Sequence, residues 1–174
     1  MRWNSVLAVP LLLCAFATPS PAVAADGSFP WKAGDTPPPV AGIALGDTEQ
    51  HVRDVLGAPS STAQMGAGTA YEYPAAGLEI VATQADGVSI IRLRTPAAGS
   101  IDGLEIGDDI ADVVAKWGQP NDGQGRVALF SAGVWTVEVR LEDNGPKIVD
   151  ILLAWNTTKW PDFDRGKAQY YRTQ

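Results

Sequence analysis

The sequence predicts an α+β fold: two tandem repeats, each a helix followed by three antiparallel strands, form one sheet with the helices on one face. Three observations predict it. Residues 43–59 return in similar form at residues 104–120, each copy has a helix pattern, and β-type segments follow each copy. The chain has 174 residues, of which 45% are hydrophobic and 19% charged, a composition typical of globular proteins.

The first element, residues 1–24, has the pattern of a secretory signal peptide. It begins with a basic residue, Arg2, continues with an apolar stretch and ends on Ala22-Val23-Ala24, a small-x-small cleavage pattern. The apolar stretch is shorter than the roughly 20 residues that a membrane span requires. We therefore expect a periplasmic or secreted protein with a cleaved signal peptide and no membrane span.

The single cysteine, Cys14, lies inside this apolar stretch. Lipidation requires a small residue directly before the modified cysteine, and Leu13 occupies that place. The sequence thus argues against a lipid anchor. After cleavage no cysteine remains, so that no disulfide is expected to stabilise the exported chain.

The net charge of the chain is −7 and becomes more negative once Arg2 is removed. An acidic surface repels phosphate backbones. We therefore expect no nucleic-acid partner.

The rest of the chain divides into an arm, two repeats and a tail. Residues 25–41 include a Pro-Pro-Pro run and are predicted to form an extended arm, with Trp31 packed on the body. The predicted repeats comprise residues 42–96 and 101–155. Residues 156–174 form an aromatic-rich C-terminal tail.

Each repeat begins with a short predicted helix. Asp47 and Asp108 are predicted to cap the helix N-termini, and Gln50 to complete a capping box in the first copy. A glycine then ends each helix, and a proline two positions later prevents its continuation. The matching positions are Gly46 and Gly107, Asp47 and Asp108, Val52 and Val113, Leu56 and Trp117, Gly57 and Gly118, and Pro59 and Pro120.

Three strands are predicted after each helix. They comprise residues 70–73, 78–83 and 88–93 in the first copy, and 127–130, 134–141 and 148–155 in the second. Asp86-Gly87 between apolar segments indicates a hairpin turn. Apolar and polar residues alternate along residues 134–141, which predicts a sheet with one buried face.

These residues resemble two families. Residues 45–48 (Leu-Gly-Asp-Thr), Val52 and residues 56–59 (Leu-Gly-Ala-Pro) resemble the repeat of outer-membrane-assembly small lipoproteins of the SmpA/OmlA type. They are also similar to the tandem-repeat β-lactamase inhibitory proteins. The resemblance covers residues 42–155 as a pattern and implies helices over an antiparallel sheet, with protein binding rather than catalysis.

Two features depart from those families. The lipoproteins carry a lipidation cysteine, which Cys14 is not, and the inhibitory proteins carry a disulfide in each repeat. The resemblance therefore implies a fold type and a non-catalytic role, and assigns no binding residue and no partner.

The sequence offers little catalytic chemistry, and we predict no catalytic, cofactor-binding or metal-binding residue. His51 is the only histidine and is expected to face solvent on the first helix. Without a cysteine in the mature chain or a second histidine, zinc ligation and Cys–His catalysis are excluded. Asp108 and Asp112 lie four residues apart. They favour the helix N-terminus, or alternatively they bind a cation or form the carboxylate pair of a hydrolase.

Aromatic residues mark two candidate partner-binding places, because aromatic side chains are enriched at interface centres. One is the outer sheet face with Tyr71 and Tyr73, for which cross-strand packing is the alternative. The other is the C-terminal region, for which a tail laid back over its own domain is the alternative. Its candidate residues are Trp155, Trp160, Phe163, Tyr170 and Tyr171.

The expected function is that of an exported, non-enzymatic protein-binding protein of the bacterial envelope, in an accessory or inhibitor-like role. Its expected partner is another envelope or secreted protein, and no cofactor is expected. The alternative is a small-molecule or glycan binder that uses aromatic residues of the sheet and tail.

Overall fold

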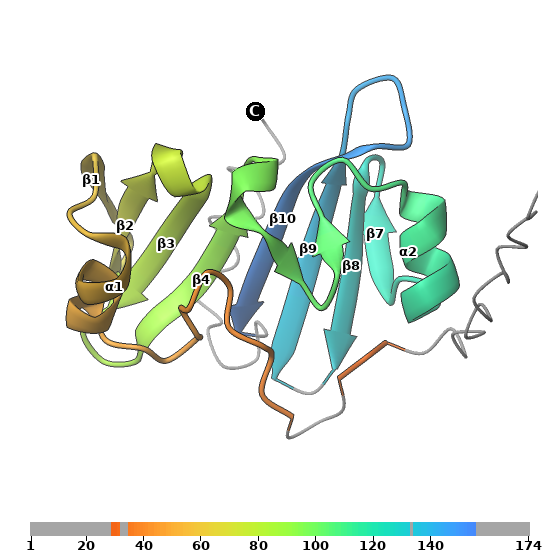
Figure 1. Cartoon of the computed structure of the whole chain (residues 1–174). Helices are drawn as coiled ribbons and strands as arrows, with labels where there is room; N and C mark the ends of the chain where they lie inside the picture. Colours follow the sequence, from red (N-terminus) through yellow and green to blue (C-terminus); the bar gives the residue numbers. More distant parts are fainter. Residues whose placement is uncertain (1–28, 32–34, 133, 156–174) are drawn as a thin grey trace, which may run out of the picture.

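The computed structural model describes residues 29–31, 35–132 and 134–155 (Figure 1). The predicted signal peptide and the tail of residues 156–174 lie outside these described residues. Most of the described chain is one antiparallel sheet of eight strands in the order β1-β2-β3-β4-β10-β9-β8-β7. Its strands are β1 (Ser61–Met65), β2 (Gly68–Tyr73), β3 (Leu78–Thr83), β4 (Gly87–Leu93), β7 (Asp122–Gln124), β8 (Val127–Ala132), β9 (Trp135–Leu141) and β10 (Ile148–Trp155).

Smaller elements complete the fold. The two α-helices are α1 (Glu49–Leu56) and α2 (Ile110–Trp117). Single 3-10 turns, η1 (Pro74–Ala76) and η2 (Pro96–Ala98), flank β3 and β4, and a separate two-stranded hairpin joins β5 (Ser100–Ile101) to β6 (Leu104–Glu105). Both α-helices lie on the same side of the large sheet (Figure 1).

The predicted fold of two tandem helix-then-three-strand repeats is wrong. Four strands of the large sheet follow each helix, the β5–β6 hairpin lies between the two groups, and the α+β class is met only loosely because one large sheet dominates the chain. The prediction missed β5 and β6, and it also missed β1 and β7, which are the edges of the large sheet. Their side chains are almost all exposed, so their sequences lack the alternation that marks a half-buried strand.

The two groups of strands join in the middle of the sheet. β4 and β10 pair antiparallel, from Leu93 opposite Ile151 to Ile90 opposite Ala154. The main core lies between the sheet and the helices. The predicted alternation in β9 is confirmed, since Trp135, Val137 and Val139 are buried while the residues between them are half-buried.

The two predicted helix caps are wrong by one residue. Thr48 caps α1 by accepting a hydrogen bond from the His51 amide (3.1 Å), and Asp109 caps α2. Asp47 instead accepts from the Ala44 amide (2.7 Å), so its carboxylate closes the loop before the helix. Gly46, with φ of +93°, turns the chain so that the Asp47 side chain points toward the Ala44 amide.

The same arrangement precedes α2. There Asp108 accepts a hydrogen bond from the Glu105 amide (2.8 Å), and the preceding glycine has φ of +100°. Asp47 and Asp108 are therefore loop-closing residues. The capping box predicted in the first helix is absent as well, because the Gln50 side chain donates to Asp54 (2.7 Å).

The arm contacts the second half of the sheet through aromatic rings. Trp31 is 7% exposed and lies 5.9 Å from Trp117 of α2 between ring centroids. Phe29 packs edge-on against Trp117 at 5.5 Å, and Phe130 of β8 packs on the same indole at 5.5 Å. The prediction that Trp31 packs on the body is confirmed.

Candidate functional site

A polar groove of about 830 Å³ lies at the start of α1. It is bounded by the helix N-terminus, the turn between β1 and β2, and the turn between β3 and β4. Glu49 and Asp86 contribute carboxylates, Thr69 a hydroxyl and Tyr71 a ring, and its described lining contains no lysine or arginine. The groove thus favours uncharged or cationic polar groups.

Backbone hydrogen bonds hold the groove together. The Gly46 amide donates to the Val88 carbonyl (2.7 Å), and the Val88 amide donates to the Asp47 carbonyl (2.7 Å). Gly87, with φ of +67°, lies directly before this contact. A Cβ atom there would lie 2.3 Å from the Asp47 carbonyl oxygen, so only glycine fits.

Two lining residues, Glu49 and Tyr71, interact with Arg53, which is not itself part of the lining. Arg53 donates to Glu49 through Nε (2.9 Å) and Nη2 (2.7 Å), and its guanidinium carbon lies 5.7 Å from the Tyr71 ring centroid. A hydrogen bond from Tyr71 and then those from Arg53 lower the pKa of Glu49. Burial, and then the hydrogen bond to Glu49, raises the pKa of Tyr71. At neutral pH the wall therefore presents a carboxylate held by a neutral phenol and a guanidinium.

A smaller pocket of about 220 Å³ lies between α2 and the β5–β6 hairpin, and its lining extends to Lys116 and Trp117 at the end of the helix. Asp108 and Asp112, the carboxylate pair considered above, both line it, together with Lys116 and Trp117. Asp108 is engaged by the Glu105 amide, and Lys116 donates to the Asp102 carbonyl. No group of three or more His, Cys, Asp or Glu side chains that could hold a metal ion occurs within the described ranges.

The two edge strands of the sheet differ. β1 has five residues, none charged and none proline, and four of its side chains are exposed. It pairs with β2 along its whole length, and none of the described strands pairs with its other edge. β7 has three residues. Because edge strands are usually protected by charge, proline or shortness, β1 is the less protected edge.

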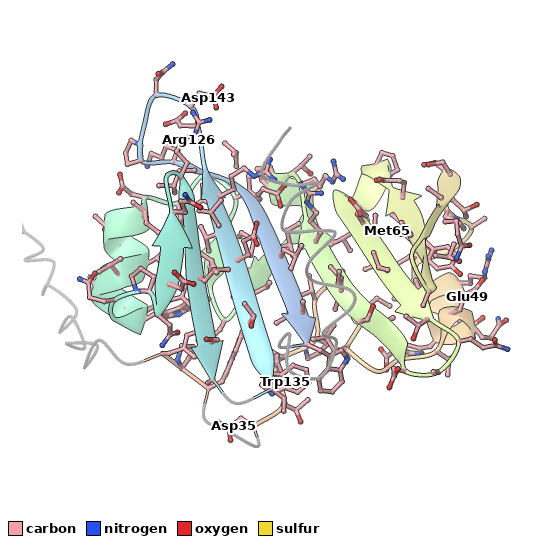
Figure 2. All side chains as sticks on the ribbon, turned by 180° about the vertical axis from the view of Figure 1, so that it is seen from behind. Asp35, Glu49, Met65, Arg126, Trp135 and Asp143 are labelled. Carbon is pink, nitrogen blue, oxygen red and sulfur yellow. The ribbon has the colours of Figure 1, made fainter. Side chains whose placement is uncertain are left out.

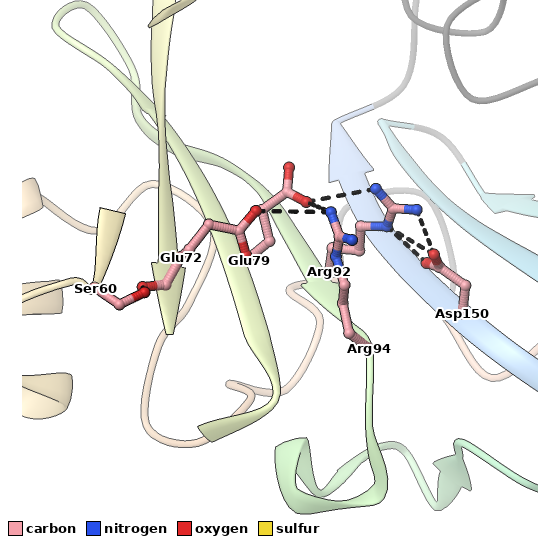
Figure 3. A network of polar contacts seen from close by, with 6 residues as sticks. All are labelled: Ser60, Glu72, Glu79, Arg92, Arg94 and Asp150. Carbon is pink, nitrogen blue, oxygen red and sulfur yellow. Dashed lines mark hydrogen bonds and ion pairs between the residues drawn. The ribbon is translucent and has the colours of Figure 1, made fainter. Parts of the chain in front are cut away.

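A charged network crosses the sheet face opposite the helices (Figure 3). Arg92 of β4 donates from Nε to both carboxylate oxygens of Asp150 on β10 (2.8 Å each) and lies 3.4 Å from Glu79 of β3. Arg94 bonds Glu79 as well and lies 3.7 Å from Glu72 of β2. The side chains of Arg92 and Glu79 are only 6% and 3% exposed. This network links the two groups of strands.

The predicted partner-binding residues differ in burial, and some of them lie outside the described residues. Tyr71 and Tyr73 are 6% and 5% exposed and belong to the core on the helix side, not to an outer sheet face. Trp155 is half-buried, and its ring stacks on Trp135 at 4.0 Å. Trp160, Phe163, Tyr170 and Tyr171 lie outside the described residues.

His51 is exposed, with Nε2 3.6 Å from the Asp47 carboxylate. Neither the groove nor the strand β1 at the edge of the sheet was predicted from the sequence. The Gly66-Ala67-Gly68 segment, which forms the turn between two Thr-containing stretches, is the one sequence signal that could have indicated that hairpin.

Comparison with known proteins concerns the fold. The chain matches no protein-family model and no curated protein. It is similar to a cysteine-rich secretory protein from Staphylococcus aureus, with a TM-score of 0.55 and 10% identity over 72% of this chain and 49% of that one. At this identity the similarity concerns the fold alone.

Two further solved structures are similar. One is a DUF4309 family protein from Bacillus subtilis (TM-score 0.48, 13% identity, 76% of this chain and 90% of that one). The other is an extracellular protein containing an SCP domain from Bacillus anthracis (TM-score 0.45, 11% identity, 66% and 45%). The chain thus spans about half the length of the two proteins described as secretory or extracellular.

None of these three proteins is of the SmpA/OmlA or β-lactamase-inhibitory type, and that resemblance stays a prediction from the sequence. Within the described part of the chain, no helix combines the length and apolar character needed to cross a membrane.

Proposed function

We propose that this chain is an exported protein of the bacterial envelope that binds another envelope or secreted protein. In this proposal residues 1–24 are removed as a signal peptide, and the mature chain acts in the periplasm or outside the cell. The partner contributes an extended segment that adds to the sheet at β1. The role is one of binding and not of catalysis.

The observation that carries the proposal is the unprotected edge of β1. Its outward backbone groups can pair with a further strand, and its side chains include no charge that such a strand would have to desolvate. The groove at the start of α1 lies at one end of this edge, because Ala67 of the β1–β2 turn and Gly68 at the start of β2 line it. A bound segment can therefore place a side chain of the partner in the groove.

A pair of lysine substitutions at the two sheet edges tests this proposal. Thr62→Lys places a charge on exposed β1, and Gln124→Lys places the same charge on exposed β7. The immobilised chain is incubated with envelope and secreted fractions of the source bacterium. We expect a protein that the unmodified chain and Gln124→Lys capture equally, and that Thr62→Lys captures at least about tenfold less, a free-energy difference of about 1.4 kcal/mol.

Hydrogen exchange on the captured complex gives an independent readout. Within residues 61–65, the amides that point away from β2 should exchange more slowly in the complex than in the free chain, because a new strand pairs with them. Equal capture by both variants, or unchanged exchange in β1, would contradict the proposal. If the chain self-associates and Thr62→Lys abolishes this self-association, then a second copy of the chain binds at this edge and the proposed partner protein does not.

A second candidate function is the binding of a small polar molecule or glycan. The groove supports it, since the carboxylates of Glu49 and Asp86 and the hydroxyl of Thr69 line it and can bind polar groups of a ligand. Because no tryptophan is among the described residues that line the groove, isothermal titration calorimetry with a panel of uncharged oligosaccharides distinguishes this candidate. Saturable binding that Glu49→Gln weakens and Thr62→Lys leaves unchanged would favour the glycan over the partner protein.

A further inference from the structure

The open edge of β1 and the groove at the start of α1 lie at the same side of the molecule. Figure 1 shows β1 close to α1, and seen from behind Met65 of β1 and Glu49 of α1 again lie at one side (Figure 2). Gln64 of β1 connects the two features, because its Nε2 donates to the carbonyl of Gly68 (2.9 Å), a residue that lines the groove. A strand added at β1 would therefore pass the groove at one end.

The register of β1 shows which of its backbone groups such a strand would use. Met65 and Gly68 lie opposite each other across a two-residue turn. Residues that flank such a turn form a hydrogen-bonded pair, and these pairs alternate along an antiparallel ladder. The backbone groups of Thr62 and Gln64 therefore point away from β2. Their side chains lie on the helix side of the sheet, because Thr62 is opposite Tyr71, which belongs to the main core.

The groove is negative overall. Asp86 lines it, and none of the described side chains bonds the Asp86 carboxylate. Glu49 lines it as well. Arg53 donates through Nε and Nη2 to one oxygen, Oε1, and the Glu49 side chain remains 48% exposed. Even where Arg53 offsets the charge of Glu49, the full charge of Asp86 exceeds the partial positive charge of about half a unit at the N-terminus of α1.

We propose that the segment binding at β1 carries a lysine or arginine that extends into this groove, an inference that rests on the function proposed above. Neighbouring strands lie about 4.8 Å apart, so an added strand lies about 10 Å from β2, whose residues line the groove. A lysine side chain reaches on the order of 6 Å, whereas serine, threonine or alanine would end above β1. The net charge of −7 favours the approach of a basic segment as well. Charge and reach thus select a basic side chain.

Three capped peptides test the inference on the full chain. Each has seven residues of alternating threonine and valine, with lysine, norleucine or glutamate at the central position. Norleucine matches lysine in length and lacks its charge. Isothermal titration calorimetry at low ionic strength measures the binding. We expect the lysine peptide to bind about threefold to tenfold more tightly than the norleucine peptide, and the glutamate peptide to bind most weakly.

Substitutions in the chain locate this preference. Asp86→Asn and Glu49→Gln should each reduce the preference for lysine over norleucine by about twofold or more. Asp143→Asn makes the same change of charge in the turn between β9 and β10, at a side chain that is 81% exposed, and should leave the preference unchanged. Thr62→Pro removes an outward amide without adding a charge, and proline is tolerated on an edge strand. It should therefore weaken the binding of all three peptides.

Three outcomes would overturn the inference, and they separate it from the proposed function. Equal binding of the lysine and norleucine peptides that Thr62→Pro weakens would leave β1 as a binding edge and remove the role of the groove. A lysine preference that Asp86→Asn and Glu49→Gln leave intact would place the basic side chain elsewhere. Absence of binding, or binding that Thr62→Pro leaves unchanged, would contradict pairing at β1 and thus both proposals.

Discussion

The two halves of the sheet, residues 43–93 with α1 and residues 104–155 with α2, share the same backbone contact at the start of the helix. The Gly46 amide donates to the Val88 carbonyl at 2.7 Å, and the Gly107 amide donates to the Ile148 carbonyl at 2.8 Å. The residue before this contact differs, since it is Gly87 in the first half and exposed Lys147 in the second. The two halves thus make equivalent backbone hydrogen bonds at the start of the helix, but only the second half has space for a side chain at the residue before this contact.

The halves also differ in how their helices are anchored. Trp117 of α2 is 2% exposed and lies within an aromatic cluster that holds the arm. Its sequence counterpart in α1, Leu56, is half-buried, and the neighbouring Val55 is 43% exposed. The second half therefore anchors its helix and the arm through the aromatic cluster, while the first half contains the groove and the open edge of β1.

The largest expected effect tests this difference in anchoring. Trp117→Ala should lower the free energy of unfolding by about 3–5 kcal/mol, because it leaves a cavity among Phe29, Trp31 and Phe130. Leu56→Ala, the matched change in α1, should cost about 1–2 kcal/mol, since part of its surface is already solvated. Urea denaturation measures both values. Equal losses would show that both helices are anchored alike.

An intermediate effect is expected at the helix contact. Gly87→Ala should cost about 2–3 kcal/mol, since alanine must adopt φ of +67° and its Cβ would meet the Asp47 carbonyl oxygen at 2.3 Å. Lys147→Ala in the second half should stay within about 0.5 kcal/mol, because that side chain is exposed. Thermal unfolding of the two variants checks the contrast, and a tolerated alanine at position 87 would contradict it.

The smallest effect concerns two tyrosines within the first half. The Tyr73 hydroxyl is buried without a hydrogen-bond partner, so Tyr73→Phe should leave stability at pH 7 unchanged or raise it by up to about 1 kcal/mol. Tyr71→Phe removes a hydrogen bond to Glu49 and should cost about 0.5–1.5 kcal/mol. Urea denaturation at pH 7 compares them, and a clear loss for Tyr73→Phe would show that its hydroxyl has a partner.

The pH dependence of the free energy of unfolding gives a second readout for Tyr73. Burial raises the pKa of Tyr73, so the unfolded chain ionises this phenol first. The associated stability is fully present below about pH 10, the ordinary tyrosine value, and is lost as the pH rises through the raised folded-state pKa. Tyr73→Phe should therefore reduce the fall in stability above pH 10. An unchanged slope would contradict this.

Much of the local structure could be predicted from the sequence. The six central strands and both helices lie close to their predicted places, since alternation and helix-ending glycines are local signals. The caps were misplaced by one residue because Asp and Thr both accept amide hydrogen bonds, and only the backbone turn at Gly46 decides between them. The edge strand β1 was missed because exposed, uncharged residues carry no burial pattern.

The sequence by itself determined where the chain changes direction, which residues alternate along β9, and that Trp31 packs on the body. Only the tertiary structure decided that β4 pairs with β10, that Tyr71 and Tyr73 face the helices, and that β1 is left at an open edge. The physical reason is the distance along the sequence between the residues that interact. Turns and alternation depend on residues a few positions apart, whereas strand order depends on contacts such as that of Arg92 with Asp150, which no local pattern encodes.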